Sequence, residues 1–463
     1  MISCAGFINK RVAVLGLGKS GLAAARALTL SGARVFAWDD GEACREKAQK
    51  EGISIREFSR VNWGQVDALV ISPGIAHTFP KSHPAAHDAK QAGVPIIGDV
   101  ELLATSGTQA PQIAITGTNG KSTTTSLLGH IVEQSGRTVE IGGNLGPSIG
   151  NMTMMERDGL YVLELSSYQL ELCPSAHFKI AVLMNISPDH LDRHGGMAGY
   201  VQAKTNIFHN QGVGDVAIVG LDDEPSRKIF NDLDRLTGRV VIPVATTRKA
   251  PGGVYVEDGN LIDDLTGDAT VIMNLDGLAN LPGIHNAQNC VAVYAAARKI
   301  RVDIEDIIEG IKSFPGLAHR QEIIEYFDGI TFVNDSKATN AEAAQKAVAC
   351  YDNVYLIVGG RAKETGLRGI GDLNKHIRKA FLIGECAEAF AAELEGKVEF
   401  EICGDLDTAT HAARDAAKND GLDHPVVLLS PACASFDQFK NFEDRGDAFR
   451  AIVDTMRLER ASA

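Results

Sequence analysis

The chain of 463 residues has little that would place it in a membrane or outside the cell. It contains no apolar run of about eighteen residues, the minimum for a membrane-spanning helix. Its first segment, Met1–Lys10, lacks the charged start and long apolar core of a signal peptide. The eight cysteines are scattered and form no C-x-x-C pair, which is typical of reduced thiols. We therefore expect a cytoplasmic protein with no membrane span.

Positive charge is scarce relative to negative charge. The chain has 45 Lys and Arg against 59 Asp and Glu, a net charge of −14. Nucleic acid and acidic membrane surfaces are therefore poor partners, although a local basic pocket for a small anion is compatible with this balance. Low-complexity tracts and solenoid-length repeats are also absent from the sequence. A hydrophobic content of 44% with 22% charged residues then indicates a globular enzyme.

The length predicts about three domains, and the sequence shows three blocks of alternating apolar strands and helices. We expect these domains at residues 1–105, 106–314 and 315–463. Such alternation is typical of parallel α/β sheets. Residues 243–281 differ, because their short β-like runs predict a small local sheet. The other expected strands are Arg11–Leu15, Arg34–Trp38, Ala68–Ile71, Gln112–Ile115, Tyr161–Leu165, Ile180–Met184, Val216–Val219, Thr331–Val333, Val354–Val358, Phe381–Ile383 and Val426–Leu429.

The most informative segment, Thr116–Thr123, reads T-G-T-N-G-K-S-T. It lies between an apolar strand and a helix-like segment, Ser122–Gln134, which is the order of a nucleotide-binding loop. Glycines let backbone N–H groups approach phosphate oxygens, and the helix N-terminus adds partial positive charge. Lys121 can reach the β- and γ-phosphates, and Ser122 can place its hydroxyl on Mg²⁺. The candidate ATP-binding residues here are Gly117, Thr118, Asn119, Gly120, Lys121, Ser122 and Thr123.

The match to the strict pattern G-x-x-x-x-G-K-[ST] is incomplete, because Ile115 stands where its first glycine would be. A glycine-rich turn before an ordinary helix is therefore the alternative interpretation. The order of strand, turn and Lys-Ser favours nucleotide binding over that alternative.

A second glycine-rich turn, Gly16-x-Gly18-x-x-Gly21, follows the first expected strand. It matches the dinucleotide fingerprint, with Asp39 about twenty residues further on. Taken alone, it indicates an NAD- or FAD-dependent enzyme. The same turn can hold another diphosphate on a helix N-terminus, including that of a UDP-sugar, or can be purely structural. The motif by itself leaves these readings open.

Polar side chains stand where expected strands end. Glu164 ends one strand, and Asn185–His194, which contains His190, follows another. Ligands bind at the carboxyl ends of strands in open α/β sheets, so Glu164 and His190 are candidates to face the loop and hold Mg²⁺. A capping or hydrogen-bonded core histidine is the alternative for His190. Lys204, in an expected helix, has the ordinary features of a solvated surface lysine.

Similar polar segments occur further along the chain. Asn334–Asn340, Gly359–Lys363 and Ser430–Phe442 each follow an expected strand directly. Asn286 and Asn289 stand near the start of a helix, where amides can read an adenine edge or serve as caps. Because these segments share a position at strand ends, we expect them to line one cleft.

Together these segments resemble the Mur ligases, the ATP-dependent ligases of bacterial cell-wall synthesis. The resemblance covers essentially the whole chain and is strongest to the member that adds D-glutamate. It rests on Gly16–Gly21 with Ser72-Pro73-Gly74, T-G-T-N-G-K-S-T, L-E-L-S-S-Y-Q-L-E, D-H-L-D-R-H, H-N-x-x-N, H-R, N-D-S-K-A-T-N and S-P-A-C-A-S-F-D-Q-F-K-N-F-x-x-R-G. It implies a Rossmann-like UDP-binding domain, a P-loop ATPase-type central domain with a parallel sheet, and a Rossmann-like C-terminal domain. Under this resemblance the Gly16–Gly21 turn serves UDP, not NAD.

The resemblance also implies a reaction. The carboxylate of UDP-N-acetylmuramoyl-L-alanine attacks the γ-phosphate of ATP, and the amine of D-glutamate then attacks the acyl phosphate. Two Mg²⁺ sites are implied, one with Ser122 and Glu164 and the other with His190 and a carbamylated Lys204. The implied catalytic residues are Lys121, Glu164, His190 and Lys204. The implied ATP contacts outside the loop are Asn286, Asn289, Arg320 and Asp335.

Other residues are assigned to the remaining substrates by the same resemblance. Arg361 stands where the family often has an acid, so Arg361 could take the role of Lys363. A folate-polyglutamate-type ligase and a non-catalytic nucleotide-binding protein stay open as alternatives, and the N-terminal domain argues against the first. We expect a monomer. The implied UDP-substrate residues are Ser20, Asp39, Ser72, Gly74, Asn144 and His190, and the implied D-glutamate residues are Lys337, Thr339, Lys363, Ser435 and Phe442.

Overall fold

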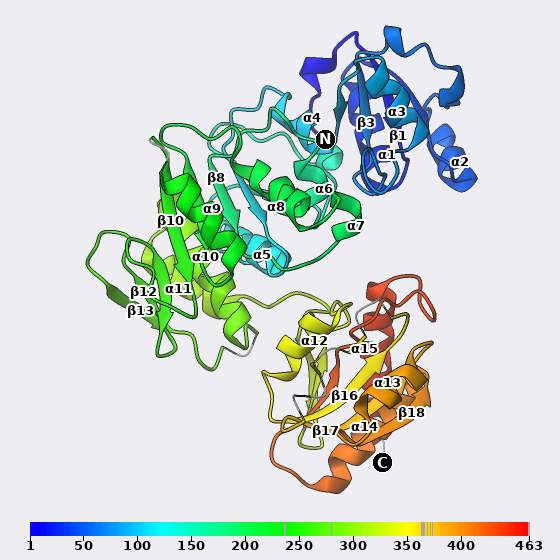
Figure 1. The fold of residues 1–463 in the computed structure, drawn as a ribbon. Coiled ribbons are helices and arrows are strands. Elements are labelled where there is room, and N and C mark those ends of the chain that lie inside the picture. The colour runs from blue at the N-terminus through cyan, green and yellow to red at the C-terminus, as the bar shows by residue number, and fades with distance from the viewer. Residues whose placement is uncertain are drawn as a thin grey trace. The chain divides into compact units, whose positions relative to one another are not determined.

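The computed structural model divides the chain into two compact units. The N-terminal unit comprises Met1–Leu275 and Ala287–Ser313, and the C-terminal unit comprises Asp276–Asn286 and Phe314–Ala463. Figure 1 shows the first unit in blue to green and the second mainly in yellow to red. The described residues are 1–235, 238–278, 280–362, 366–367, 369–370, 372 and 374–461.

The N-terminal unit begins with a four-stranded parallel sheet in the order β2-β1-β3-β4. Its inner strands are short apolar runs buried along their length, as expected for strands covered on both faces. The strands are β1 (Arg11–Leu15), β2 (Arg34–Trp38), β3 (Ala68–Ile71) and β4 (Ile96–Ile97). The helices are α1 (Lys19–Leu30), α2 (Glu42–Lys50), α3 (Pro84–Gln91) and α4 (Asp99–Ala104), with 3-10 turns at Ala5–Phe7, Phe58–Arg60 and Trp63–Gln65.

A nine-stranded sheet follows, in the order β13-β12-β11-β10-β9-β8-β5-β7-β6. The strands are β5 (Gln112–Thr116), β6 (Val139–Gly143), β7 (Leu160–Glu164), β8 (Ile180–Leu183), β9 (Val216–Gly220), β10 (Val240–Ala245), β11 (Val254–Glu257), β12 (Asn260–Asp263) and β13 (Thr270–Asn274). The helices are α5 (Lys121–Gln134), α6 (Ser167–Leu170), α7 (Leu191–His194), α8 (Met197–Thr205), α9 (Glu224–Asp234), α10 (Ile284–Lys299) and α11 (Ile304–Ser313), with 3-10 turns at Ile149–Asn151 and Asn206–Phe208.

The local sheet expected over residues 243–281 is corrected by this topology. The short strands there continue the main sheet, because β10 pairs in parallel with both β9 and β11. Only β12 runs against the other strands, because it pairs antiparallel with both β11 and β13 in a meander at the sheet edge. The sequence signal was misread because Gly- and Asp-rich turns separate these strands, whereas the sheet is held together by backbone pairing that composition does not reveal.

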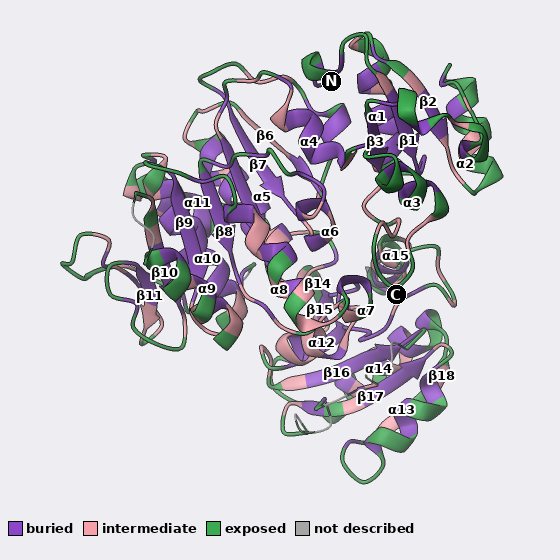
Figure 2. Cartoon of the chain, turned by 45° about the horizontal axis from the view of Figure 1, so that its top comes forward, coloured by how far each residue is buried: buried purple, intermediate pink, exposed green. Residues whose placement is uncertain are grey.

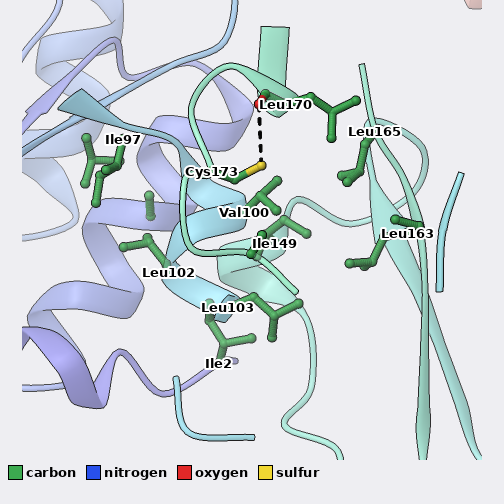
Figure 3. Packing of buried hydrophobic residues seen from close by; sticks show 14 of the residues in the cluster. Ile2, Ile97, Val100, Leu102, Leu103, Ile149, Leu163, Leu165, Leu170 and Cys173 are labelled. Atoms are coloured by element: carbon green, nitrogen blue, oxygen red, sulfur yellow. Dashed lines mark hydrogen bonds between the residues drawn. The ribbon is translucent and has the colours of Figure 1, made fainter. Parts of the chain in front are cut away.

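One hydrophobic cluster joins the two sheets of the N-terminal unit. Figure 3 shows Val100, Leu102 and Leu103 of α4 beside Ile149 and Leu163, all of which are buried. Figure 2 shows β7, β8 and β9 buried along their length. A fully buried side chain of this kind contributes about 1.5–3 kcal/mol to stability. Since the strands end inside this shared core, the residues at their carboxyl ends are held in fixed positions.

The C-terminal unit contains a six-stranded sheet in the order β14-β15-β19-β16-β17-β18, parallel except for β14. Alternate residues of strand β16 pack into different cores on the two faces of the sheet. Val354 and Leu356 pack with residues of α12 and α13. Tyr355 and Ile357 pack with residues of α14 and α15. Helices therefore cover both faces. The elements are β14 (Glu322–Phe327), β15 (Ile330–Asn334), α12 (Ala341–Val348), β16 (Asn353–Gly359), β17 (Ile377–Ile383), α13 (Ala387–Leu394), β18 (Phe400–Gly404), α14 (Leu406–Asp420), β19 (Pro425–Leu429) and α15 (Phe442–Ala461).

The expected fold class is confirmed as α/β with largely parallel sheets. Of the described helices, none combines the length and the apolar character needed to cross a bilayer.

Candidate active site

The glycine-rich loop lies between β5 and α5, as the sequence predicted. Gly117 and Gly120 have positive φ angles of 157° and 82°. A Cβ at Gly117 would lie 2.8 Å from the Cβ of Met184, and one at Gly120 would collide with Oδ1 of Asn289. Only glycine therefore fits either position without a shift of the neighbours. The loop ends at the N-terminus of α5, where backbone N–H groups lack partners within the helix.

Side chains after β8 hold the loop, and sequence analysis missed their role. The Asn119 N–H donates to Oδ1 of Asn185 at 2.9 Å, and the Thr118 N–H donates to the Asn185 carbonyl at 2.9 Å. The Thr118 hydroxyl also donates to the Ser187 carbonyl at 3.1 Å and lies 3.0 Å from the Tyr200 hydroxyl. These hydrogen bonds hold the glycine-rich loop against the segment that follows β8. The only sequence signal was the position of Asn185 directly after a strand.

Two lysines converge on one backbone carbonyl of this loop. Nζ of Lys121 donates to the carbonyls of Gly117 at 3.0 Å and Thr118 at 2.8 Å. Nζ of Lys204, from α8, donates to the same Gly117 carbonyl at 2.7 Å. An ammonium on Lys204 would be repelled by that of Lys121, and the burial of Lys204 limits the solvent screening of this repulsion. The arrangement concentrates positive charge beside the loop.

Lys204 is buried, so the interpretation as a solvated surface lysine is wrong. Its residue is 2% exposed. Burial lowers the pKa of its ammonium well below the ordinary value, and the nearby Lys121 lowers it further, while Asp189 and Glu164 oppose the shift. The ring of Tyr200, 4.8 Å away, provides some compensation through its π face. A lysine in this setting is under electrostatic pressure to lose its charge.

Glu164 lies beside the loop because β7 pairs with β5 and places Glu164 opposite Ile115. Its side chain is buried, and Oε1 accepts a hydrogen bond of 2.6 Å from Nδ2 of Asn144. Oε2 is buried with no hydrogen-bond partner among the described residues. A buried carboxylate oxygen without a donor is costly, and a hard cation such as Mg²⁺ would satisfy it. Glu164 therefore fits the expected magnesium site.

His190 has a left-handed backbone conformation, with φ of 52°, directly before α7. Its side chain is 47% exposed and its Nε2 lies 3.4 Å from Oδ2 of Asp189. Its ring centroid is 5.3 Å from that of Tyr168. The interpretation as a buried core histidine is therefore wrong, and although His190 occupies the N-cap position, its side chain makes no capping hydrogen bond. The imidazole is placed at an accessible edge next to a carboxylate.

No group of three His, Cys, Asp or Glu side chains that could hold a metal occurs in the described part of the chain. The expected ion would therefore draw on the Ser122 hydroxyl and on nucleotide phosphates in addition to Glu164, which is the usual manner of Mg²⁺ binding. Ser122 is buried in the first turn of α5, and Thr123 follows it half-buried. Nearby, Oδ1 of Asn289 accepts a hydrogen bond of 3.1 Å from Thr124, so Asn289 lies against the loop.

The sequence did not predict a network of buried polar side chains near His190. Nε2 of His194 lies 2.9 Å from the Ser167 hydroxyl, and its Nδ1 lies 2.9 Å from Oε1 of Glu171. Arg193, also buried, donates through Nη2 to the Ile75 carbonyl at 2.9 Å. This last bond ties the loop after β3 to α7. The sequence offered only the D-H-L-D-R-H and L-S-S-Y-Q-L-E strings, which do not show that the two segments meet.

The loop after β1 is held by the residues that the sequence assigned to the UDP substrate. The Leu17 N–H donates to Oδ2 of Asp39 at 2.6 Å, and the Ser72 hydroxyl donates to the Gly16 carbonyl at 3.1 Å. Asp39 therefore braces the glycine-rich turn through a backbone amide. Ser20 is half-buried in the first turn of α1, and Gly74 is exposed.

In the C-terminal unit, Asp335 is buried directly after β15. Its Oδ2 accepts a hydrogen bond of 2.7 Å from the Ser430 hydroxyl, and its Oδ1 accepts one of 3.2 Å from the Gln321 N–H. Burial raises the pKa of this carboxyl to about 7, although these hydrogen bonds oppose the shift. Two other expected ATP contacts also lie in this unit. Arg320 is half-buried, and Nδ2 of Asn286 donates to the Pro282 carbonyl at 2.8 Å.

Arg445 holds the loops of this unit together and was not predicted. It is 1% exposed, and its Nη2 donates to the carbonyls of Ser336 at 2.8 Å and Cys433 at 3.1 Å, while Nε donates to the Ser336 hydroxyl at 3.0 Å. The Ser336 hydroxyl in turn donates to the Phe442 carbonyl at 2.8 Å. Nζ of Lys337 lies 3.7 Å from the centroid of the Phe442 ring. The structure thus brings together Lys337 and Phe442, two of the residues expected to receive D-glutamate.

The remaining predicted acceptor residues are placed as follows. Thr339 is half-buried in the turn after β15, and Ser435 is buried in the loop after β19. Lys363 lies outside the described residues. Arg361 forms a two-pronged ion pair with Glu385, with Nη2–Oε1 at 2.9 Å and Nε–Oε2 at 3.1 Å. Its guanidinium is therefore engaged by a carboxylate of the chain itself.

Comparison with known proteins gives the same picture as these motifs. The Mur ligase MurD-like N-terminal domain family matches residues 10–98, and the Mur ligase middle domain family matches residues 115–297. The UDP-N-acetylmuramoylalanine–D-glutamate ligase of Paramagnetospirillum magneticum is 51% identical over 456 residues, covering 98% of both chains. That of Caulobacter vibrioides is 47% identical over 461 residues, with the same coverage.

Solved structures share the fold at low identity. UDP-N-acetylmuramate-alanine ligase MurC of Thermotoga maritima has a TM-score of 0.59 at 17% identity, covering 96% of this chain and all of that chain. MurF of Acinetobacter baumannii has a TM-score of 0.59 at 16% identity, covering 96% of this chain and 94% of that chain. The parallel sheets and the glycine-rich loop define an α/β protein with a P-loop-like turn. Within that class, the chain belongs to the Mur ligase family.

Proposed function

We propose that the chain is an ATP-dependent ligase that joins D-glutamate to UDP-N-acetylmuramoyl-L-alanine and releases ADP and phosphate. The observation that carries the proposal is the charge arrangement at the loop, where Lys121 and Lys204 share the Gly117 carbonyl and Glu164 presents an unpaired oxygen. This is the arrangement that a nucleotide triphosphate with a cation would complete. The choice of D-glutamate is supported by the curated relatives, which are named for that activity.

The proposed reaction has two steps. The carboxylate of the UDP substrate attacks the γ-phosphorus of ATP, and the bond to the β,γ-bridging oxygen breaks to give an acyl phosphate and ADP. The amine of D-glutamate then attacks the acyl carbon, the amide forms, and phosphate leaves. Activation is needed because a carboxylate is a poor electrophile at neutral pH. The loop amides and Lys121 bind the phosphates and balance the charge that moves during transfer.

Mg²⁺ would be held at two sites in this proposal, by Ser122 and Glu164 at one and by His190 and Lys204 at the other. When bound, the ions would neutralise phosphate charge during transfer. The pressure on Lys204 to lose its charge supports carbamylation of its nitrogen by CO₂. A carbamate would remove the repulsion from Lys121 and would supply oxygen ligands suited to a hard cation.

Carbamylation has a direct test in the Lys204→Ala variant. It should be nearly inactive, and a short carboxylate such as acetate should restore part of the rate by replacing the carbamate. A lysine that acts as an amine predicts no response to acetate. The matched control is Lys179→Ala, since the Lys179 side chain is half-exposed and its Nζ bonds Asp215 outside the site; it should keep the normal rate with or without acetate.

The roles of the other predicted residues form part of the proposal. The domain of residues 1–105 would bind the UDP part, that of residues 106–314 would bind ATP, and that of residues 315–463 would bind the amino acid. Asp39 and Ser72, which brace the turn after β1, support the first assignment. The ATP contacts would be completed by Asn286, Asn289, Arg320 and Asp335, the UDP-side contacts by Ser20, Gly74, Asn144 and His190, and the D-glutamate contacts by Lys337, Thr339, Lys363, Ser435 and Phe442.

We also propose that the protein is a cytoplasmic monomer acting in peptidoglycan precursor synthesis. All eight cysteines are free thiols, which supports a reducing compartment. The proposed substrates, ATP and a UDP-linked sugar, are small anions. Nucleic acid is not an expected partner, because the chain has a net negative charge.

Phosphate release from ATP tests the function. The assay contains ATP, Mg²⁺ and UDP-N-acetylmuramoyl-L-alanine, with candidate amino acids added one at a time. We expect rapid release with D-glutamate and little with L-glutamate, L-alanine or meso-diaminopimelate. Comparable turnover with L-alanine or meso-diaminopimelate would assign the chain to a different member of the family. Absence of release with every amino acid would refute the ligase proposal itself.

A further inference from the structure

Two cysteines from distant parts of the chain touch inside the C-terminal unit. Sγ of Cys386 lies 3.4 Å from Sγ of Cys433, and the two residues are 6% and 0% exposed. Cys386 directly precedes α13, and Cys433 lies in the loop after β19. The proposed ligase reaction uses neither thiol, so their proximity needs a separate explanation.

Three strand-end loops meet around the two sulfurs. The Cys386 N–H donates to the Gly360 carbonyl at 3.1 Å, which ties the loop after β17 to the loop after β16. Arg361 and Ala434 exchange backbone hydrogen bonds of 2.9 and 3.1 Å, which tie the loop after β16 to the loop after β19. The Glu385 N–H donates to Oδ2 of Asp437 at 3.1 Å and closes the set. The backbone therefore holds the two thiols against each other.

Cys386 is the more accessible of the two thiols, at 6% exposed against 0% for Cys433. Its pKa is lowered, first by the hydrogen bond that it shares with the Cys433 thiol and further by a backbone hydrogen bond from Gly360, although burial opposes the shift. The pKa of Cys433 is raised by the same pairing and by burial. Cys386 also lies at the N-terminus of α13, a helix of eight residues, which favours a thiolate. Its slight exposure gives a small oxidant access from the surface.

We propose that Cys386 and Cys433 form an oxidant-sensitive pair that closes to a disulfide when a hydroperoxide reaches Cys386. The Cys386 thiolate sulfur attacks a peroxide oxygen, the O–O bond breaks, and protonation of the departing oxygen releases water with hydrogen peroxide as oxidant. Cys433 then attacks the resulting sulfenic sulfur; the S–S bond forms, the S–O bond breaks, and the thiol proton leaves with hydroxide as a second water. Two electrons pass from the two thiols to one peroxide.

Closure would disturb the loops that surround the expected amino-acid site. The sulfurs must approach from 3.4 Å to about 2.0 Å, so the two side chains must rotate or the loops that carry them must move. The Cys433 carbonyl accepts a hydrogen bond from Arg445, which also holds Ser336 beside Asp335 and Lys337. A misplacement of about 1 Å in a substrate-positioning group can reduce a rate roughly a hundredfold. The loss of activity rests on the proposed ligase function, whereas disulfide formation does not.

Peptide mapping tests the chemistry and phosphate release tests the consequence. The full-length protein is treated with hydrogen peroxide, digested without reduction and examined by mass spectrometry. We expect a linked peptide that contains Cys386 and Cys433. We also expect D-glutamate-dependent phosphate release to fall about tenfold or more and to recover with dithiothreitol. A loss of this size is smaller than the roughly hundredfold effect that a misplaced substrate-positioning group can have. Absence of the linked peptide would overturn the proposal, whatever the ligase assay shows.

Variants separate this pair from other thiols. Cys386→Ser should keep the untreated rate and resist peroxide, whereas the matched control Cys403→Ser, which removes a half-buried thiol on β18, should stay sensitive. Inactivation that persists in Cys386→Ser would contradict the assignment. A linked peptide without loss of activity would contradict the inhibitory effect alone. If Cys386→Ser fails to fold, the linked peptide in the unmodified sequence still decides whether the disulfide forms.

Discussion

The two units of this molecule place charged residues at strand ends in contrasting ways. Around the glycine-rich loop, Lys121 and Lys204 share one carbonyl, and one oxygen of Glu164 has no partner among the described residues. In the C-terminal unit, Asp335 accepts bonds at both oxygens, and Arg445 donates through Nε and Nη2 to groups of its own unit, although its buried Nη1 has no partner among the described residues.

This difference separates a binding centre from a scaffold. Buried charges that repel each other or lack partners cost free energy, and the folded chain tolerates them where a ligand satisfies them. Buried charges that are hydrogen-bonded within the chain hold loops in place, whether or not a ligand is present. We therefore expect changes at the loop to affect activity without loss of stability, and changes at Arg445 to lower stability directly.

The largest expected effect comes from Lys121→Ala. Loss of a cation that balances phosphate charge should cost about 3 kcal/mol in the barrier, roughly a hundredfold in rate, while the fold survives. Phosphate release at saturating ATP measures the rate, and circular dichroism checks the fold. A variant that keeps more than about a third of the wild-type rate would show that Lys121 does not have this role.

Arg445→Met should act on stability. It retains much of the side-chain volume but leaves three buried acceptors, the carbonyls of Ser336 and Cys433 and the Ser336 hydroxyl oxygen, without their donor. We expect a loss of about 2 kcal/mol or more and an apparent melting temperature lower by about 5 °C. The matched control is Arg450→Met, whose partly exposed guanidinium pairs with Glu322 and should matter little. If both variants lower the melting temperature equally, Arg445 contributes no more to stability than a partly exposed arginine.

A smaller effect is expected at Asp99, a buried carboxyl outside the proposed site. Neither of its oxygens accepts a hydrogen bond of good geometry from the described residues, and burial raises its pKa to about 6, although the nearby Gln169 side chain and Val100 backbone oppose the shift. A raised carboxyl pKa means that the folded state holds its proton more tightly, so its contribution to stability falls as pH rises from about 4 through 6. Asp99→Asn should therefore raise the melting temperature by a few degrees at pH 8 and by less at pH 5. A larger rise in melting temperature at pH 5 than at pH 8 would contradict the expected pH dependence.

The sequence was sufficient for most of the buried strands. Apolar runs such as Ala68–Ile71 and Val426–Leu429 became strands at the expected residues, because continuous apolar runs bounded by turns suit a sheet that is covered on both faces. The edge strands β4, β6, β14 and β18 were missed. Short or partly exposed strands, such as Glu322–Phe327 with its mixture of charged and apolar residues, give a weak signal.

The candidate site was only partly predictable. The positions of Lys121 and Glu164 follow from local order along the chain, since Lys121 begins the helix after the glycine-rich turn and Glu164 ends a strand. Burial of Lys204 does not, because it depends on how α8 packs against a loop 87 residues earlier in the sequence. The role of Arg445 was missed for the same reason: it stands in the F-x-x-R-G end of the C-terminal motif, but the motif does not show that its side chain reaches three acceptors in distant loops.

The most direct test of the contrast between the two units compares Lys204→Met with Arg445→Met. Melting temperatures are measured without ligands in buffer free of CO₂, where Lys204 cannot be carbamylated. The lowered pKa of Lys204 means that the ammonium destabilises the folded state increasingly as pH falls below the ordinary lysine range, so removing the amine should raise the melting temperature, more at pH 7 than at pH 10. We predict opposite shifts, upward for Lys204→Met and downward for Arg445→Met. A melting temperature that falls in both variants would contradict the distinction between a charge-strained binding centre and a hydrogen-bonded scaffold.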